Sequence, residues 1–136
     1  TVALESVENL SLDIWLSLII KGKEHLLSGH DIANVYSLAK NKNVKCLLLN
    51  CNTVEKTDHI LEAFIAAWGG EWGVYPNMGL SDPEPDGAMD QKVDEQSFRK
   101  TISAYLEKNP KVIGSCCGST PKHTKVIYDF VHTENF

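Results

Sequence analysis

No apolar run in this 136-residue sequence is long enough to cross a membrane. The longest extends from Ile14 to Ile20 and is interrupted by Ser17, whereas a transmembrane helix needs about 20 apolar residues. A basic stripe is also absent, because 18 acidic residues outnumber 13 lysines and arginines and the net charge is -5. Domains that bind nucleic acid typically carry a basic surface. We therefore expect neither a membrane nor a nucleic acid as a partner.

The sequence also lacks the loop-rich composition of a small disulfide-bonded scaffold. It has four cysteines, but long apolar segments separate them, and disulfide-dense domains are built mainly of loops. We expect a cytoplasmic protein, in which clustered thiols bind a metal or take part in chemistry. No signal peptide is visible, and the first residue is Thr1 rather than methionine, so we expect the sequence to be a piece of a longer protein.

Strand patterns and helix patterns alternate four times along the chain. The predicted strands cover residues 13–20, 44–51, 72–75 and 111–116. The predicted helices cover residues 31–40, 54–68, 94–106 and 121–132, and a further short helix is expected within residues 2–11. The acidic stretch 80–93 is expected to be a solvated loop. This order is typical of an α/β fold with a parallel sheet and helical crossovers.

Helix-capping residues mark where several of these helices begin. Asp31, Asp94 and Thr120 are predicted N-caps, because their side chains accept hydrogen bonds from the first backbone amides of a helix. Asn52, followed three residues later by Glu55, resembles a capping box for the second helix.

Three cysteines stand at the ends of two predicted strands. Cys51 ends one strand, and Cys116 and Cys117 end another. Adjacent side chains of a regular strand point to opposite faces, so the double cysteine addresses one atom only where the strand breaks, and Gly114 and Gly118 bracket such a break. Functional groups of parallel α/β folds gather at the carboxyl ends of strands. Thiolates favour zinc, copper(I) or iron–sulfur clusters, and three cysteines suit a zinc ion with one open position.

The remaining candidate ligands are expected to lie outside this site. Cys46 is an odd number of residues from Cys51 in the same strand, so strict alternation makes it a core residue that faces the helices. The five histidines have no metal-binding spacing to one another and are expected to be surface or capping residues. A purely structural zinc stays open as an alternative, although structural sites usually use four protein ligands.

Three blocks of the sequence resemble the homocysteine S-methyltransferase family. They are Asn50-Cys51, the segment VYPNMG at residues 74–79 and the segment IGSCCGSTPKH at residues 113–123. The blocks occur in the family's order and at similar spacing, and the double cysteine followed by Gly-x-Thr-Pro-x-His is a specific motif. The resemblance covers essentially the whole chain but only the second half of the family's domain.

The resemblance implies a fold of the (β/α)8 barrel type. Residues 1–136 would be the carboxyl-terminal part of a homocysteine-binding domain, resembling strands five to eight, which is a half barrel. Ser115 stands where the family usually has glycine, and Leu48 stands near another usual glycine. Both side chains would crowd the strand ends. A half barrel has open sheet edges, so we expect self-association or pairing with the missing half of the barrel.

The resemblance also implies the site and its chemistry. Cys51, Cys116 and Cys117 match the zinc ligands, and Asn77 matches a residue that faces the metal and would fill the fourth position without substrate. The implied activity is zinc-dependent methyl transfer to the thiol of homocysteine, forming methionine. Relatives use S-methylmethionine, S-adenosylmethionine, betaine or methylfolate as the methyl donor. The alternative is a non-catalytic zinc-binding half barrel or an inactive paralogue, because the family's other substrate-holding residues belong to strands outside this sequence.

Overall fold

The computed structural model describes residues 2–7, 11–81, 89 and 92–133. Four parallel strands form the main sheet in the order β1-β4-β5-β6, with every neighbouring pair parallel. These strands are β1 (Ile14–Leu18), β4 (Val44–Thr53), β5 (Glu71–Asn77) and β6 (Val112–Ile113). The helices are α1 (Val2–Val7), α2 (Ile32–Asn41), α3 (Val54–Trp68), α4 (Glu95–Leu106) and α5 (Pro121–Thr133). The predicted parallel α/β fold is confirmed.

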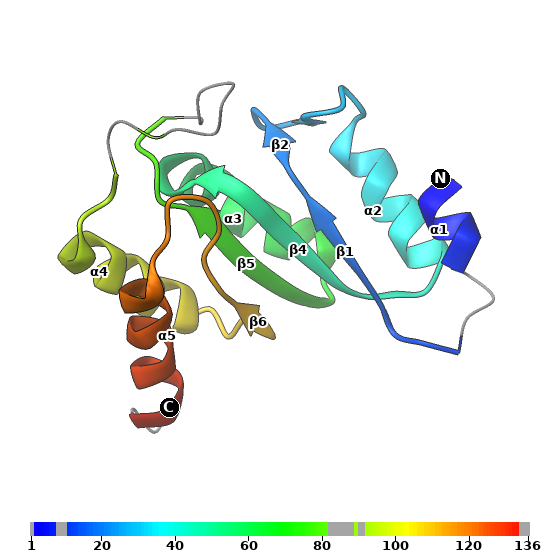
Figure 1. The fold of residues 1–136 in the computed structure, drawn as a ribbon. Helices are drawn as coiled ribbons and strands as arrows, with labels where there is room; N and C mark the ends of the chain where they lie inside the picture. The colour runs from blue at the N-terminus through cyan, green and yellow to red at the C-terminus, as the bar shows by residue number, and fades with distance from the viewer. Residues whose placement is uncertain (1, 8–10, 82–88, 90–91, 134–136) are drawn as a thin grey trace.

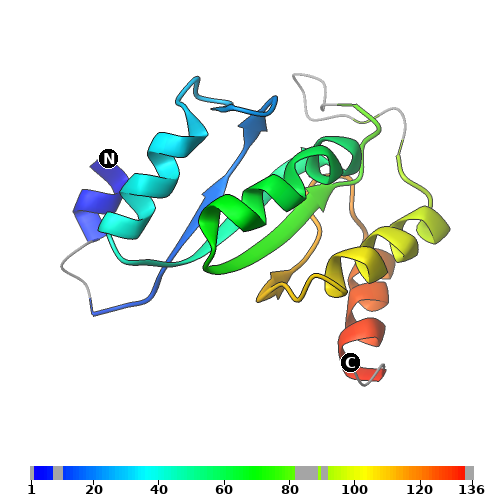
Figure 2. The same cartoon turned by 180° about the vertical axis from the view of Figure 1, so that it is seen from behind.

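Three of the helices, α2, α3 and α4, connect successive strands of the main sheet and lie on one face of it. Figure 2 shows α3 lying along the sheet with α2 and α4 on either side of it, and Figure 1 views the opposite face. Among the described residues, no helix combines the length and the apolar composition that a membrane span requires. Most of the predicted acidic loop at 80–93 lies outside the described residues.

The main hydrophobic core lies between the sheet and α3. Leu47 and Leu49 of β4 are almost completely buried and belong to one cluster with Leu61 and Phe64 of α3. Apolar residues on alternate positions of a strand share one face, so this face of β4 is the one that packs against the helices.

Cys46 lies on the other face of β4. It is completely buried, as predicted, but it alternates with Leu47, so the prediction that it faces the helices is wrong. Alternation cannot be extended from Cys46 to Cys51, because Cys51 has φ +52° and the pairing of β4 with β5 shifts between Asn50 and Thr53.

The predicted strand at 13–20 is divided into two elements. β1 ends at Leu18, and the chain then forms a short antiparallel hairpin of β2 (Ile20–Lys21) and β3 (His25–Leu26). Gly22, with φ +77°, provides the turn. The backbone N–H of Ile20 donates to the side chain of Asn52 at 3.0 Å rather than to another strand, so pairing in the main sheet stops before it.

Two of the helices begin at their predicted N-cap residues, and a third has its N-cap one residue later than predicted. Asp31 and Asp94 accept backbone hydrogen bonds as the N-caps of α2 and α4, as predicted. The N-cap of α3 is Thr53, whose hydroxyl accepts from the backbone N–H of Lys56 at 3.2 Å. The capping box predicted from Asn52 is therefore misplaced by one residue, because that side chain instead accepts from the hairpin.

Candidate metal centre

Three thiols meet at the carboxyl ends of β4 and β6. The sulfur of Cys117 lies 3.4 Å from that of Cys51 and 3.9 Å from that of Cys116, and all three sulfurs lie within 4.8 Å of one another. Zinc–sulfur bonds of about 2.3 Å in a tetrahedron place the sulfurs about 3.8 Å apart. This donor set therefore fits one zinc ion with small adjustments. Within the described ranges, no other group of three potential ligands comes together.

Cys51 reaches the cluster through a break in the strand. Its φ of +52° lies in the left-handed region, which residues other than glycine rarely adopt. The side-chain amide of Asn77 donates to the carbonyl of Cys51 at 2.9 Å. This contact joins the end of β5 to the turn that presents the Cys51 thiol.

The double cysteine lies in a turn, as the two flanking glycines predicted. The backbone N–H of Cys116 donates to the carbonyl of Pro76 at 2.8 Å, and the carbonyl of Cys117 accepts from the N–H of Met78 at 2.9 Å. Gly118 has φ +74°, and a Cβ there would lie 2.7 Å from the sulfur of Met89. The left-handed backbone therefore favours glycine at this position, and an added Cβ would also require the flexible Met89 side chain to move.

α5 begins directly after this turn. The backbone N–H of Thr120 donates to Nδ1 of His123 at 3.0 Å, and the Thr120 hydroxyl lies at the same distance from that nitrogen. His123 also stacks edge-on against Phe98 of α4, with ring centroids 4.9 Å apart. The capping role expected for a histidine is confirmed by His123, whereas the Thr120 hydroxyl is paired with the His123 ring and not, as the N-cap prediction required, with a backbone amide. The His123 contact fixes the helix to the turn that carries the thiols.

The surroundings of Cys51 and Cys117 favour the protonated forms of these two thiols when no metal is bound. Burial raises the pKa of the Cys51 thiol. The hydrogen bond with Cys51, followed by burial, raises the pKa of Cys117. Metal ligands must be deprotonated, so binding of a metal ion here has to release protons.

Two polar residues near this end of the sheet, Asn50 and Tyr75, were not singled out from the sequence as site residues. The side-chain oxygen Oδ1 of Asn50 lies 3.8 Å from the sulfur of Cys116 and accepts from this thiol. Tyr75 is paired with Asn50 in the β4–β5 ladder, and its hydroxyl is hydrogen-bonded to the hydroxyl of Ser17 of β1. Their register directly below the strand ends is the sequence signal that would have identified them.

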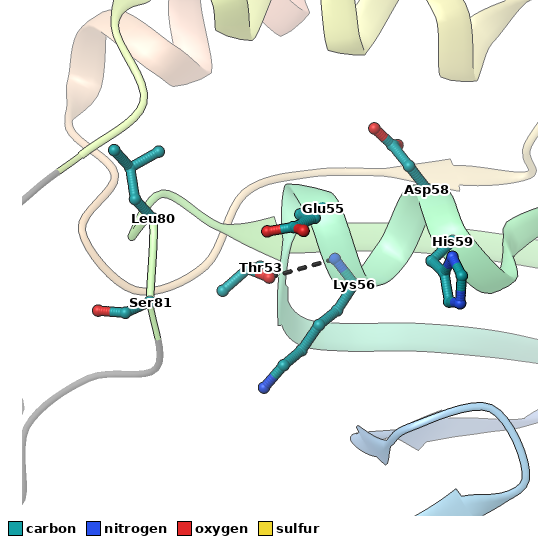
Figure 3. A pocket seen from close by; sticks show the side chains of 7 residues that line it. All are labelled: Thr53, Glu55, Lys56, Asp58, His59, Leu80 and Ser81. Carbon is teal, nitrogen blue, oxygen red and sulfur yellow. Dashed lines mark hydrogen bonds between the residues drawn. The ribbon is translucent and has the colours of Figure 1, made fainter.

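A hollow at the carboxyl end of β4 holds no convergent group of side chains. It has a volume of about 750 Å³ and is lined by the first turns of α3 together with Leu80 and Ser81. Figure 3 shows Lys56, Asp58 and His59 pointing in different directions. Asp58 accepts from the hydroxyl of Tyr105 at 2.7 Å, so it supports the packing of α3 against α4. The chemistry of this end of the sheet therefore belongs to the thiols.

Fold and site together define a parallel α/β protein with a trithiol cluster at the carboxyl edge of its sheet. The family model for homocysteine S-methyltransferase matches residues 1–131. The chain belongs to the homocysteine S-methyltransferase family.

Two curated relatives are named homocysteine S-methyltransferase, and a third is named selenocysteine methyltransferase. Homocysteine S-methyltransferase YbgG of Bacillus subtilis is 25% identical over 115 residues, covering 83% of this chain and 36% of the relative. Homocysteine S-methyltransferase 1 of Brassica oleracea is 24% identical over 129 residues, which cover 93% of this chain and 40% of the relative. Selenocysteine methyltransferase of Astragalus bisulcatus is 21% identical over 124 residues, which cover 89% of this chain and 37% of the relative. The chain thus spans well under half the length of these relatives.

Solved structures of one enzyme are similar to this fold. The apo form of the homocysteine methyltransferase MmuM from Escherichia coli superposes with a TM-score of 0.70 at 20% identity, covering 93% of this chain and 43% of MmuM. Its metallated form gives a TM-score of 0.67 at 22% identity, covering 91% and 39%. MmuM is an enzyme of the TIM-barrel type. The predicted resemblance to part of a (β/α)8 barrel is therefore confirmed.

Proposed function

We propose that this chain supplies the zinc centre of a methyltransferase that acts on the thiol of homocysteine and forms methionine. One observation carries the proposal: three thiols lie within 4.8 Å of one another at the carboxyl edge of the sheet in a member of the homocysteine S-methyltransferase family. Family membership supports methyl transfer to homocysteine, and the cluster supports zinc as the metal.

The proposed ligands are Cys51, Cys116 and Cys117. Three protein ligands leave one position of a tetrahedral zinc open, and a zinc ion held there would deprotonate a substrate thiol that takes this position. Cys117 is exposed, whereas Cys51 and Cys116 are half-buried. The exposed side of the cluster is therefore where we expect the substrate to approach.

The methyl transfer itself is a single displacement. The acceptor sulfur forms a bond to the methyl carbon while the bond from that carbon to the donor's sulfur or nitrogen breaks, and the bonding electrons leave with the donor. S-Methylmethionine, S-adenosylmethionine, betaine and methylfolate are the donors to be compared. A selenol is a second candidate acceptor, because one relative is named a selenocysteine methyltransferase.

The state of the cysteines supports a reducing, cytoplasmic setting for this chemistry. All four cysteines are free thiols in the structure. The cytosol keeps thiols reduced, and the proposed site requires three reduced sulfurs.

A non-catalytic zinc-binding half barrel is the alternative. It is favoured by the fact that the chain covers only 36% to 40% of the length of the first two curated relatives, so homocysteine and donor would need contacts from elsewhere. A chimera that joins the chain to the part of YbgG it does not match separates the two. We expect the chimera to form methionine from homocysteine with at least one donor, and its Cys51→Ala form to be inactive. An inactive chimera that binds zinc would favour the alternative.

A further inference from the structure

We propose that Asn50 is a positioning residue whose side-chain amide donates a hydrogen bond to the Cys116 thiolate in the metal-bound chain, and that this bond keeps Cys116 from being methylated. The inference rests on the metal centre and the methyl transfer proposed above and deepens them. It concerns selectivity, because the ligand sulfurs and the substrate sulfur would all be thiolates on one zinc ion, whereas the methyl group has to reach the substrate alone.

The side chain of Asn50 contacts the Cys116 thiol directly. Its Oδ1 lies 3.8 Å from Sγ of Cys116 and accepts from this thiol. A metal ligand must be deprotonated, so a bound Cys116 has no proton to donate and would be repelled by an oxygen. The other end of the amide carries two N–H donors, and rotation about the last side-chain bond exchanges the two ends at little cost. The same contact therefore becomes an N–H donor to the thiolate.

Tyr75 confines the Asn50 amide on the side away from the thiols. The two residues are register partners in β5 and β4, and such partners project to the same face of a sheet. The Tyr75 hydroxyl is hydrogen-bonded to Ser17 of β1, and β4 lies between β1 and β5 (Figure 1). The tyrosine side chain therefore crosses β4 on the face that carries Asn50, which leaves the amide directed toward Cys116.

The other two ligand sulfurs have backbone N–H groups beside them. Burial is the main cause that raises the pKa of Cys51, and the backbone N–H of Cys117 acts in the opposite direction. The hydrogen bond with Cys51 is the main cause that raises the pKa of Cys117, and its own backbone N–H opposes this. An N–H group that lowers the pKa of a thiol stabilises the thiolate. Cys116 takes its donor from a side chain, so a substitution can remove it.

Hydrogen bonds of this kind make a sulfur a poorer nucleophile. They stabilise the charged form, and the intrinsic nucleophilicity of a thiolate falls as its basicity falls. A substrate sulfur in the open position would receive none of these three N–H groups, because each is directed to a ligand. The substrate sulfur is then the one that attacks the donor's methyl carbon fastest, and the ligands stay unmethylated.

Iodomethane tests whether Asn50 shields Cys116. The attacking thiolate forms a bond to the methyl carbon while iodide leaves with the bonding electrons. The zinc-loaded wild-type chain, Asn50→Leu and Asn50→Asp would be methylated to less than one group per chain, and mass spectrometry would locate the methyl groups. Neither variant has the N–H donor, so we expect Cys116 to react about tenfold faster in both, which is about 1.4 kcal/mol in the barrier.

Two controls make this result specific. The rate at Cys117 should stay unchanged, because its N–H group belongs to the backbone. Asn34→Leu, at an exposed position of α2, should leave the rate at Cys116 at the wild-type value. An unchanged rate at Cys116 in the Asn50 variants, or an equal rise at both cysteines, would overturn the inference.

A metal-free measurement separates this inference from the metal centre. The S–H stretching band in a Raman spectrum reports the hydrogen bond of a thiol, and the difference between wild type and Cys116→Ser identifies the band of Cys116. We expect Asn50→Leu to move this band to the position of a free thiol, whereas Asn50→Asp, which keeps an acceptor, should not. An unmoved band in Asn50→Leu would overturn the inference. A chain that binds no zinc but shows the moved band would refute the metal centre and leave the positioning role of Asn50 supported.

Discussion

At the scale of single residues, the cluster depends on three sulfurs that the chain brings together from positions 51, 116 and 117. Cys117 lies between the other two, at 3.4 Å from Cys51 and 3.9 Å from Cys116. Each sulfur supplies one of the three donors that fit a tetrahedral zinc. Loss of any one leaves two thiolates, which is below the number found in ordinary zinc sites.

Replacing Cys116 or Cys117 with serine should therefore remove the metal. We expect zinc affinity to fall by more than about 100-fold, which exceeds the usual effect of losing a supporting residue. Elemental analysis of protein purified without chelator measures this directly, and the wild-type chain should hold one zinc. Cys46→Ser is the control, because that thiol lies five residues before Cys51 and outside the cluster. Metal loss in this control would mean that the ligand set is wrong.

The buried thiol of Cys46 should make stability depend on pH. Burial, followed by the charge of Glu71, raises the pKa of Cys46, and Lys111 partly opposes this. A raised pKa means that the folded state holds the proton more strongly, so its contribution is complete below the unfolded pKa of about 8.5 and is lost as the pH rises above it.

Urea unfolding of the reduced, metal-free chain between pH 8 and pH 10 measures this dependence. We expect the free energy of unfolding to fall with pH, and to fall less steeply in Cys46→Ala. The slope for one group is limited to about 1.4 kcal/mol per pH unit. Identical slopes for the two proteins would show that Cys46 is not the responsible group.

Cys46 also shows where reasoning from the sequence reached its limit at this scale. Its burial and the convergence of the other three cysteines could be predicted, because strand ends and flanking glycines are local features. Its facing direction could not, because the left-handed residue at Cys51 interrupts the alternation of β4. Nothing in the sequence marks that residue, since Cys is not a usual left-handed residue.

At the scale of elements, β5 and β6 approach each other closely at Gly73. A Cβ at this position would lie 2.5 Å from Cδ2 of Leu48, 2.7 Å from Cβ of Val112 and 2.8 Å from the Val112 carbonyl oxygen. Leu48, which stands near a usual glycine of the family, is buried in the space that Gly73 leaves. The crowding expected from Leu48 is thus accommodated by a glycine on the neighbouring strand.

Gly73→Ala should weaken the attachment of β6 and with it the double-cysteine turn. Overpacking of this kind typically costs about 1–3 kcal/mol, and we expect the upper end because one neighbour is a backbone oxygen. Chemical denaturation gives the change in stability, and zinc affinity should fall in the same variant. Leu48→Ala added to Gly73→Ala should recover only part of the loss, since Val112 remains in contact. Full recovery would mean that β6 moves freely and that the close packing is unimportant.

Helix α3, which ends at a glycine in its own sequence, has the predicted bounds, whereas the last strand, which depends on contacts with β5, does not. α3 has the predicted bounds because Gly69, with φ +68°, ends it. The last strand was predicted at 111–116 but is limited to Val112–Ile113. Beyond it the N–H groups of Gly114 and Cys116 still donate to the carbonyls of Val74 and Pro76 of β5, at 2.9 and 2.8 Å, but the regular pairing with β5 ends at Ile113. Such a departure depends on β5, which lies about forty residues away, and cannot be read from the strand's own residues.

At the scale of the whole molecule, the described sheet has two unpaired edges. β1 pairs only with β4, and β6 only with β5. A cavity of about 540 Å³ lies beside β1, and its lining includes Leu16, Leu18 and Leu38. Trp15 of the same strand is 53% exposed. Unpaired backbone groups beside exposed apolar side chains are a template for pairing with another chain.

We therefore expect the 136-residue chain to self-associate through β1 in solution. Sedimentation equilibrium should give a mass above the 15.1 kDa of one chain. A charge on an edge strand opposes pairing, so Trp15→Lys should shift the chain toward monomer. Tyr128→Lys is the matched control, because Tyr128 is similarly exposed, at 56%, but lies on α5. A stable wild-type monomer, or equal dissociation by both substitutions, would show that β1 is not the contact. Zinc content should be the same in both variants, because neither substitution touches the thiols at the opposite end of the strands.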